Sequence, residues 1–202
     1  MPERYSTVVI GTSAGGMNAL TSILSKLTDK FIPTIIIVQH IQEEGTDGYR
    51  TTFLNKKCAL PVEDAIDKTP IQPGTVYLAP PAYHLLLEES GTLSLSIDEP
   101  VNYSRPSIDV LFESAAVAFK EKLIGIILTG ANNDGEAGLK KIKQMGGYTI
   151  VQDPDEAEAK AMPLAAIKGT EVDQVLPLEQ IGRFLAKLGT PTINTNSKQP
   201  HK

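Results

Sequence analysis

Three side chains that together can make a serine nucleophile each follow a short apolar segment. Ser13 lies in a glycine-rich run, His40 comes after a β-branched segment, and Asp134 stands near the end of a polar loop. A serine hydroxyl attacks a carbonyl only when a neighbouring base such as imidazole takes its proton, and a carboxylate behind the imidazole fixes its tautomer. These residue types therefore indicate acyl transfer through a Ser-His-Asp triad, if the fold brings the three loops together.

Each of these residues also has a structural interpretation. Ser13 could cap the helix that follows it, and Asp134 belongs to an Asn-Asn-Asp-Gly run that is typical of turns and helix N-caps. His201 lies in a polar tail, and His84 is the main competitor of His40 as the base. Because His84 precedes a predicted hairpin, away from the nucleophile loop, we expect it to shape the substrate groove and not to be the base.

The glycine-rich run at residues 11–16 must also be compared with phosphate-binding loops. A dinucleotide fingerprint needs glycine where this chain has Ser13, and an acidic residue where the second strand ends at Gln39 and His40. A P-loop needs lysine and a hydroxyl residue where this chain has Met17 and Asn18. Both motifs fail at the positions that carry their chemistry, so nucleotide binding is kept only as a rival interpretation.

The elements that must position these side chains alternate between strand and helix. Short apolar or β-branched runs predict strands at residues 6–10, 34–38, 76–79, 123–128, 148–152 and 172–175, and a hairpin at 84–87 and 93–97. Apolar residues at helical spacing predict helices at residues 19–27, 48–57, 108–119, 136–145 and 178–188. Ser107 is the expected N-cap of the helix at 108–119.

This alternation predicts an α/β fold, a doubly wound, mainly parallel sheet with helices on both faces and one β-hairpin. Sites in such folds lie at the carboxyl ends of the strands. That rule places three loops at one edge: residues 11–16, the segment from 39 onward, and residues 129–135. We expect one domain over residues 1–189 and a disordered polar tail at 190–202.

Composition excludes several classes of function. The chain has 202 residues and a net charge of −5, and it shows no basic stripe of the kind that nucleic-acid binding needs. It has no apolar run near the length of a membrane span, and no histidine pair at metal-ligand spacing. Its one cysteine, Cys58, allows no internal disulfide and is interpreted as structural. We therefore expect a cytoplasmic protein without nucleic-acid partner, membrane insertion, metal or cofactor.

Several motifs, in order along the chain, resemble those of the chemotaxis protein-glutamate methylesterases, the CheB family. They are residues 10–16, Val38-Gln-His40, Tyr77-Leu-Ala-Pro80 with His84, residues 105–112, residues 128–135 and Met162-Pro163. Each motif is weak alone, but the ordered set is specific and runs from about residue 7 to 188.

The resemblance implies hydrolysis of glutamate γ-methyl esters on a chemoreceptor or similar signalling protein, in bacterial signal transduction, with glutamine deamidation in some members. It makes Ser13 the nucleophile, His40 the base and Asp134 its partner. The backbone N–H groups of Ala14 and Ala131 would form the oxyanion hole. Ala14 opens a predicted helix, whose N-terminal N–H groups favour developing negative charge.

Three features differ from the usual family pattern. Family members commonly have methionine where this chain has Ala131, and an apolar stretch ending in glycine where it has residues 159–161. They also carry a receiver domain, which we expect to be missing here, leaving regulation to a separate protein. The rival interpretations are another esterase or amidase with the same triad, and a non-enzymatic signalling interaction module.

Overall fold

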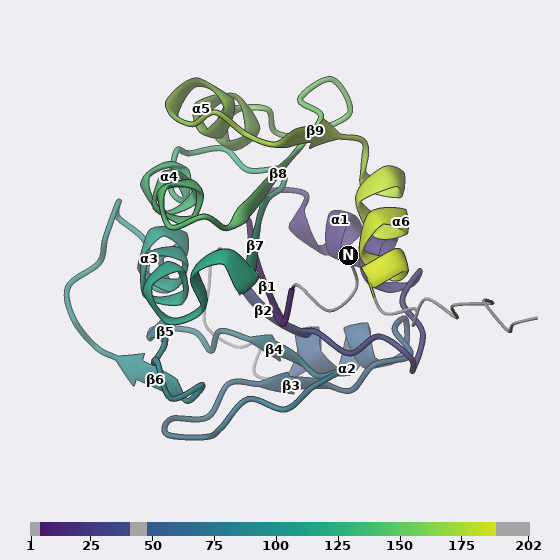
Figure 1. The fold of residues 1–202 in the computed structure, drawn as a ribbon, viewed down its shortest axis with the longest axis vertical. Coiled ribbons are helices and arrows are strands. Elements are labelled where there is room, and N and C mark those ends of the chain that lie inside the picture. The colour runs from purple at the N-terminus through teal and green to yellow at the C-terminus, as the bar shows by residue number, and fades with distance from the viewer. Residues whose placement is uncertain (1–4, 41–47, 189–202) are drawn as a thin grey trace, which may run out of the picture.

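A seven-stranded parallel sheet forms the centre of the computed structural model, which describes residues 5–40 and 48–188 (Figure 1). Its strand order is β3-β4-β2-β1-β7-β8-β9. The strands are β1 (Thr7–Thr12), β2 (Thr34–Gln39), β3 (Val62–Asp64), β4 (Val76–Leu78), β7 (Leu123–Ile127), β8 (Tyr148–Gln152) and β9 (Gln174–Leu176). The doubly wound α/β fold expected from the alternating pattern is confirmed.

The central strands are buried along their whole length. Every residue of β1, β2 and β7 is buried, and most are β-branched. In β1, Val9 pairs in register with Ile36 of β2 on one side and with Gly125 of β7 on the other. Such continuous apolar runs suit a strand that is covered on both faces, because a half-exposed strand would alternate with polar residues.

Helices cover both faces of the sheet (Figure 1). One face packs against α1 (Gly16–Leu24), α2 (Tyr49–Asn55) and α6 (Leu178–Leu188). The other packs against α3 (Ile108–Phe119), α4 (Glu136–Gln144) and α5 (Ala161–Gly169). A short 3-10 turn, η1 (Lys120–Lys122), leads from α3 into β7. The protein therefore has two hydrophobic cores, one on each face of the sheet.

The expected hairpin is also present, as β5 (His84–Leu87) paired antiparallel with β6 (Leu93–Ser96). It is separate from the main sheet and packs against α3, contributing the buried side chains of Leu85, Leu87 and Leu93 to the second core. The hairpin thereby supports the helix whose first turn reaches the candidate site.

Some elements differ from the sequence-based expectation. β3 was not expected, because it has only three residues and only Val62 is buried. α5 was not expected either, since it contains a proline and its buried residues are only Met162, Pro163 and Ala166. The last strand begins at Gln174, not at residue 172, and it is a partly exposed edge strand without the apolar run of the central ones. The expected tail at 190–202 lies outside the described residues.

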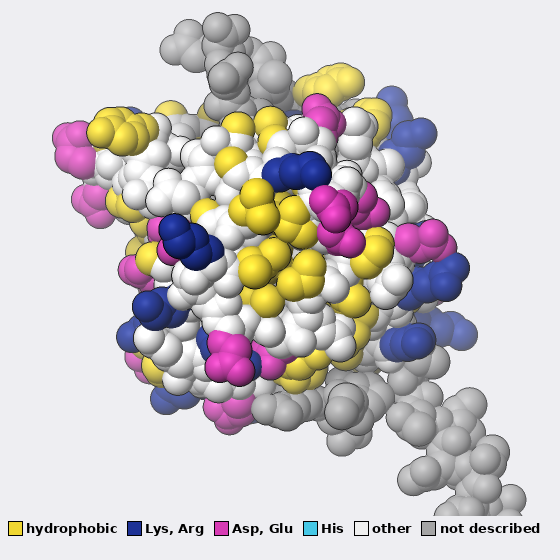
Figure 2. All heavy atoms as spheres, turned by 90° about the horizontal axis from the view of Figure 1, so that it is seen from above, with side chains coloured by type: hydrophobic (Ala, Val, Ile, Leu, Met, Phe, Trp, Pro, Cys, Tyr) yellow, Lys and Arg dark blue, Asp and Glu magenta, His cyan; other side chains and the backbone are white. Residues whose placement is uncertain are grey.

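The face formed by α5 and β9 is partly apolar. Leu164 of α5 and Val175 of β9 are 52% and 41% exposed. Figure 2, which views the molecule from this side, shows hydrophobic side chains gathered among charged ones.

Within the described ranges, no helix has both the length and the apolar character needed to cross a bilayer.

Two glycines let the start of α3 approach the sheet closely. A Cβ atom on Gly11 would lie 2.3 Å from Cγ2 of Ile108, the first residue of α3. One on Gly135 would lie 2.7 Å from the same atom, and Gly135 also has a φ of +98°, which glycine tolerates best. Ile108 therefore fits between the ends of β1 and of the loop after β7 because neither glycine has a side chain.

We predict that Gly11→Ala destabilises the fold by about 1–3 kcal/mol through overpacking against Ile108. Denaturant unfolding of Gly11→Ala, Ile108→Ala and the double variant would measure this. Because Ile108→Ala removes the clashing atom, the double variant should lose less stability than the sum of the single losses. Simple additivity would contradict the proposed contact.

Candidate active site

The carboxyl ends of three neighbouring strands, β2, β1 and β7, are joined to one another by hydrogen bonds. The Ser13 N–H donates to the carbonyl of Thr129 at 2.9 Å, and the His40 N–H donates to the carbonyl of Thr12 at 3.0 Å. The Thr129 hydroxyl donates to the carbonyl of Ala14 at 2.8 Å. These bonds fix the loops after β1, β2 and β7 relative to one another at one edge of the sheet.

A cleft of about 620 Å³ opens at this edge. Its lining residues come from four segments of the chain and include a serine, a histidine and an arginine. They are Ser13, Ala14, His40, Tyr103, Ser104, Arg105, Pro106, Ala131 and Asn132. Four residues expected at the site from the sequence, Ser13, His40, Ala14 and Ala131, therefore share one cavity.

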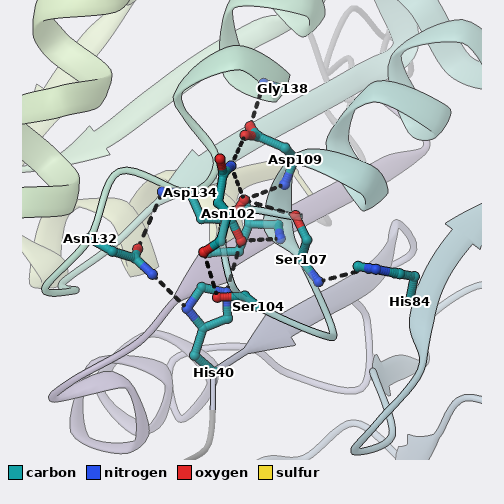
Figure 3. A network of polar contacts seen from close by, with 10 residues as sticks. His40, His84, Asn102, Ser104, Ser107, Asp109, Asn132, Asp134 and Gly138 are labelled. Atoms are coloured by element: carbon teal, nitrogen blue, oxygen red, sulfur yellow. Dashed lines mark hydrogen bonds and ion pairs between the residues drawn. The ribbon is translucent and has the colours of Figure 1, made fainter. Parts of the chain in front are cut away.

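Asp134 lies behind His40 and is completely buried. His40 Nε2 lies 2.8 Å from Oδ2 of Asp134 (Figure 3). A carboxylate can only accept, so Nε2 carries the ring proton and Nδ1 keeps the lone pair. The nitrogen that can act as a base is therefore Nδ1. It accepts a hydrogen bond from Nδ2 of Asn132 at 3.3 Å, and this bond must open before Nδ1 can take a proton.

The carboxylate of Asp134 also caps helix α3. It accepts the backbone N–H groups of Ile108 at 2.6 Å and Asp109 at 3.2 Å. Ser107 occupies the expected N-cap position, but its hydroxyl makes no capping bond and donates instead to Oδ1 of Asp134 at 2.8 Å. Capping by a residue distant in sequence thus replaces the expected local cap, and the positive end of the helix dipole faces the carboxylate.

The surroundings of Asp134 keep it ionised. Burial raises its pKa, but hydrogen bonds from His40, the Ile108 N–H, Ser107 and Asn102 outweigh burial and hold the pKa below its ordinary value. A carboxylate behind an imidazole must remain charged if it is to stabilise the imidazolium. The electrostatics of the site therefore suit the role of a triad acid.

A second buried carboxylate, Asp109, lies beside Asp134. The amide nitrogen of Asn102 donates to both, at 2.8 Å to Asp109 and 3.2 Å to Asp134. Asp109 also accepts the N–H of Gly138 at 2.7 Å. Burial, together with the negative charge of Asp134, raises the pKa of Asp109 to about 6 against its hydrogen bonds. Asn102 thus separates two carboxylates that would otherwise face each other.

The Ser13 hydroxyl is half-buried in the cleft and has no hydrogen-bond partner among the described residues. The backbone N–H groups of Ala14 and Ala131 likewise have no acceptor within residues 5–40 and 48–188. A free hydroxyl and two free N–H donors at one cavity can receive a carbonyl group, with the donors available to the oxygen that becomes negative.

His84 lies apart from this group, on the far side of Ser107 (Figure 3). It is 1% exposed and does not line the cleft. Its Nδ1 accepts the N–H of Ser107 at 3.2 Å, so Nε2 carries the proton and donates to the carbonyl of Glu99 at 3.1 Å. His84 therefore holds the start of α3 through Ser107, and the expectation that it shapes the substrate groove is not supported, because neither His84 nor Ser107 lines the cleft.

Asn102, Asp109 and Asn132 belong to the site but were not expected there from the sequence. Asp109 looks like an ordinary acidic residue in the first turn of a helix, and Asn102 like a loop residue. Asn132 stands in the polar run before Asp134, which was the one available signal.

Among the described residues, no three histidine, cysteine or acidic side chains are arranged to hold a metal ion.

The chain matches the family model for the CheB methylesterase over residues 8–185. A relative from Leptospira interrogans is 52% identical over 91% of this chain and 95% of its own length. It is named a putative protein-glutamate methylesterase/protein-glutamine glutaminase. A Xanthomonas campestris relative with the corresponding name is 41% identical over 87% of this chain, which spans about half of that protein (50%).

A solved structure gives the same fold. The crystal structure of the Thermotoga maritima CheB methylesterase catalytic domain matches with a TM-score of 0.86 at 34% sequence identity. The match covers 91% of this chain and 98% of the other.

We predict a pH-dependent contribution of Asp109 to stability. Because its folded-state pKa of about 6 exceeds the ordinary value of 3.8, the folded protein binds this proton more tightly than the unfolded chain. The contribution is fully present below the unfolded pKa and is lost as pH rises through about 6.

The test compares the unfolding free energies of the wild type and Asp109→Asn from about pH 4 to pH 7. The wild type minus variant difference should fall as pH rises, since the asparagine cannot titrate. A flat or rising difference would show that folding does not raise the pKa of Asp109.

Proposed function

The chain belongs to the CheB methylesterase family, and on this basis we propose that it hydrolyses glutamate γ-methyl esters of a chemoreceptor or similar signalling protein. Ser13 serves as nucleophile, His40 as base and Asp134 as its charged partner. The observation that carries the proposal is the pairing of His40 with a buried, ionised Asp134 at the back of a cleft that Ser13 lines. The single cysteine, which forms no internal disulfide, supports a cytoplasmic setting.

In the first half of the reaction, Oγ of Ser13 attacks the ester carbonyl carbon while Nδ1 of His40 takes the hydroxyl proton. The carbonyl oxygen becomes negative and is stabilised by the N–H groups of Ala14 and Ala131. Collapse of this tetrahedral intermediate breaks the bond to the methoxy oxygen, which receives the proton from Nδ1 and leaves as methanol. An acyl-enzyme on Ser13 remains.

In the second half, Nδ1 takes a proton from a water molecule, whose oxygen attacks the acyl carbon. The new tetrahedral intermediate expels Oγ of Ser13, which recovers its proton from His40. The product is a glutamate side chain, and the enzyme returns to its starting state. In both halves the charge of Asp134 stabilises the transient imidazolium of His40.

The same residues can act on glutamine. Attack on the side-chain amide follows the same path, with ammonia as the leaving group in place of methanol. The relatives from Leptospira interrogans and Xanthomonas campestris carry both activities in their names. We therefore propose glutamine deamidation as a second activity of the same site, measured by ammonia release.

We predict that Ser13→Ala and His40→Gln remain folded and lose activity by on the order of 10³-fold or more. Methanol release from membranes carrying a methylated chemoreceptor would be measured, with circular dichroism to follow folding. Ser25→Ala is the matched control, because Ser25 is an exposed residue at the end of α1 and lies outside the cleft. Wild-type methanol release by Ser13→Ala would overturn the assignment of the nucleophile.

Covalent labelling separates the rival interpretations. A fluorophosphonate should label Ser13 of the wild type and leave Ser13→Ala unlabelled. An esterase or amidase acting on another substrate would be labelled but release no methanol from the receptor. A non-enzymatic interaction module or a nucleotide-binding protein would show neither reaction.

We predict that Asp134→Asn costs both activity and stability. Asparagine has one acceptor oxygen for the donors that the carboxylate now satisfies, so the cap of α3 is weakened by about 1–3 kcal/mol. It also removes the charge behind His40, and activity should fall by roughly 10⁴-fold. Thermal unfolding and methanol release measure the two effects separately, and a fully active variant would exclude Asp134 as the triad acid.

A further inference from the structure

One wall of the cleft is a short segment, residues 101–106, which we call the arm. Val101 and Ser104 exchange backbone hydrogen bonds at 3.2 and 2.9 Å, closing a tight turn around Asn102 and Tyr103. Residues 103–106 all line the cleft. The arm therefore presents its outermost residue, Tyr103, beside the nucleophile and the base.

The backbone of the arm is strained at its tip. Asn102 and Tyr103 have φ values of +51° and +60°. Asparagine tolerates this left-handed region, but for a bulky side chain such as tyrosine it is a genuine outlier. Strain of this kind persists only where the surrounding structure imposes it, and it is concentrated at functional sites. The tip of the arm is thus held in a conformation that Tyr103 does not prefer.

Side chains on both sides of Tyr103 hold the arm in place. Asn102 binds Asp109 and Asp134, the second of which also binds His40 (Figure 3). Nη1 of Arg105 donates to the carbonyls of Ile97 and Asp98 at 2.9 and 3.0 Å. These two residues are used to fix the arm. The Tyr103 side chain, in contrast, is fully exposed at 103%.

We propose that Tyr103 is the anchor on which the substrate protein docks, its ring packing against an apolar side chain near the esterified glutamate. This proposal rests on the proposed function and names how the same site recognises its substrate. Tyrosine suits an anchor, because it buries a large area at the cost of fixing only two side-chain torsions.

The ring of Tyr103 defines the docking segment. Arg105 is the one permanently charged side chain among the described residues that line the cleft, and it already donates to the carbonyls of Ile97 and Asp98. The ionised Asp134 lies behind His40, so the cleft has no excess charge that would select an acidic or a basic segment. The partner is a stretch of the substrate protein that places an apolar side chain next to the esterified glutamate, where it can pack on Tyr103.

Docking and chemistry are linked through one side chain. Oδ1 of Asp134 accepts the Asn102 amide that holds the arm, while Oδ2 accepts His40. The anchor is thus fixed relative to the base by two hydrogen bonds to a single carboxylate. A substrate that packs on Tyr103 is placed at a defined position with respect to Ser13 and His40.

Tyr103→Gly is the sharpest test, because glycine adopts a positive φ readily and the variant therefore keeps the backbone of the arm. Two rates are measured: methanol release from membranes carrying a methylated chemoreceptor, and labelling of Ser13 by a small fluorophosphonate. The ratio of the first rate to the second should fall about tenfold or more, as for a tyrosine at the centre of an interface.

Two further variants complete the experiment. Tyr103→Phe should restore the ratio to within about twofold of the wild type, since the proposed contact is made by the ring. Ile32→Ala is the control and should leave the ratio unchanged, because Ile32 is 62% exposed but precedes β2, at the opposite end of the strand from the cleft.

A wild-type ratio in Tyr103→Gly would overturn the proposal. A Tyr103→Phe variant as impaired as Tyr103→Gly would also overturn it, because the hydroxyl and not the ring would then make the contact. If the wild type itself were neither labelled nor active, the proposed function would fail separately. Cosedimentation of wild type and Tyr103→Gly with the receptor membranes would still test the anchor, with weaker binding expected for the variant.

Discussion

A fully buried negative charge, the carboxylate of Asp134, is the feature on which the rest of the site depends. An ionised carboxylate is tolerated inside a protein only if donors replace the water it has lost. Here those donors are a helix N-terminus, a serine hydroxyl, an asparagine amide and the imidazole of His40. All of these groups bind the same carboxylate, so the site is organised around the two side-chain oxygens of Asp134.

This requirement explains why α3 begins where it does. The N-terminal N–H of α3 can reach Asp134 only because Ile108 fits against Gly11 and Gly135 without a clash. The glycines that look like flexible loop residues are therefore needed for close packing between a helix end and two strand ends. Helix α3 therefore packs against the end of β1 and against the loop after β7 at its first residue, Ile108.

The same carboxylate gives the imidazole its direction. In the serine-protease triad Nε2 of the histidine is the base and Nδ1 binds the aspartate, whereas here Nε2 binds Asp134 and Nδ1 keeps the lone pair. Asn132 donates to Nδ1 and accepts the N–H of Asp134 through its own oxygen at 3.2 Å. The amide nitrogen must therefore point to His40, which completes a closed ring of three residues that holds the imidazole from both sides.

The architecture and the edge of the sheet at which the site lies could be predicted from local sequence patterns. Buried strands and amphipathic helices are local patterns, so the order of elements predicted a parallel sheet and placed Ser13, His40 and the loop of Asp134 at one edge. Short or weakly patterned elements such as β3 and α5 escaped because a few residues carry little periodic signal. For the same reason the predicted start of β9, at residue 172, was wrong, and the strand begins at Gln174.

The contacts between side chains of the site depend on tertiary packing and could not be predicted from the sequence. It made Asp134 the cap of α3 in place of Ser107, buried His84 behind Ser107, and brought Asn102 between two carboxylates. These contacts join residues that are far apart in the chain. A hydrogen bond forms only when its donor and acceptor are placed to within a few tenths of an ångström. Such distances follow from how helices and strands pack, which no local pattern of residues contains.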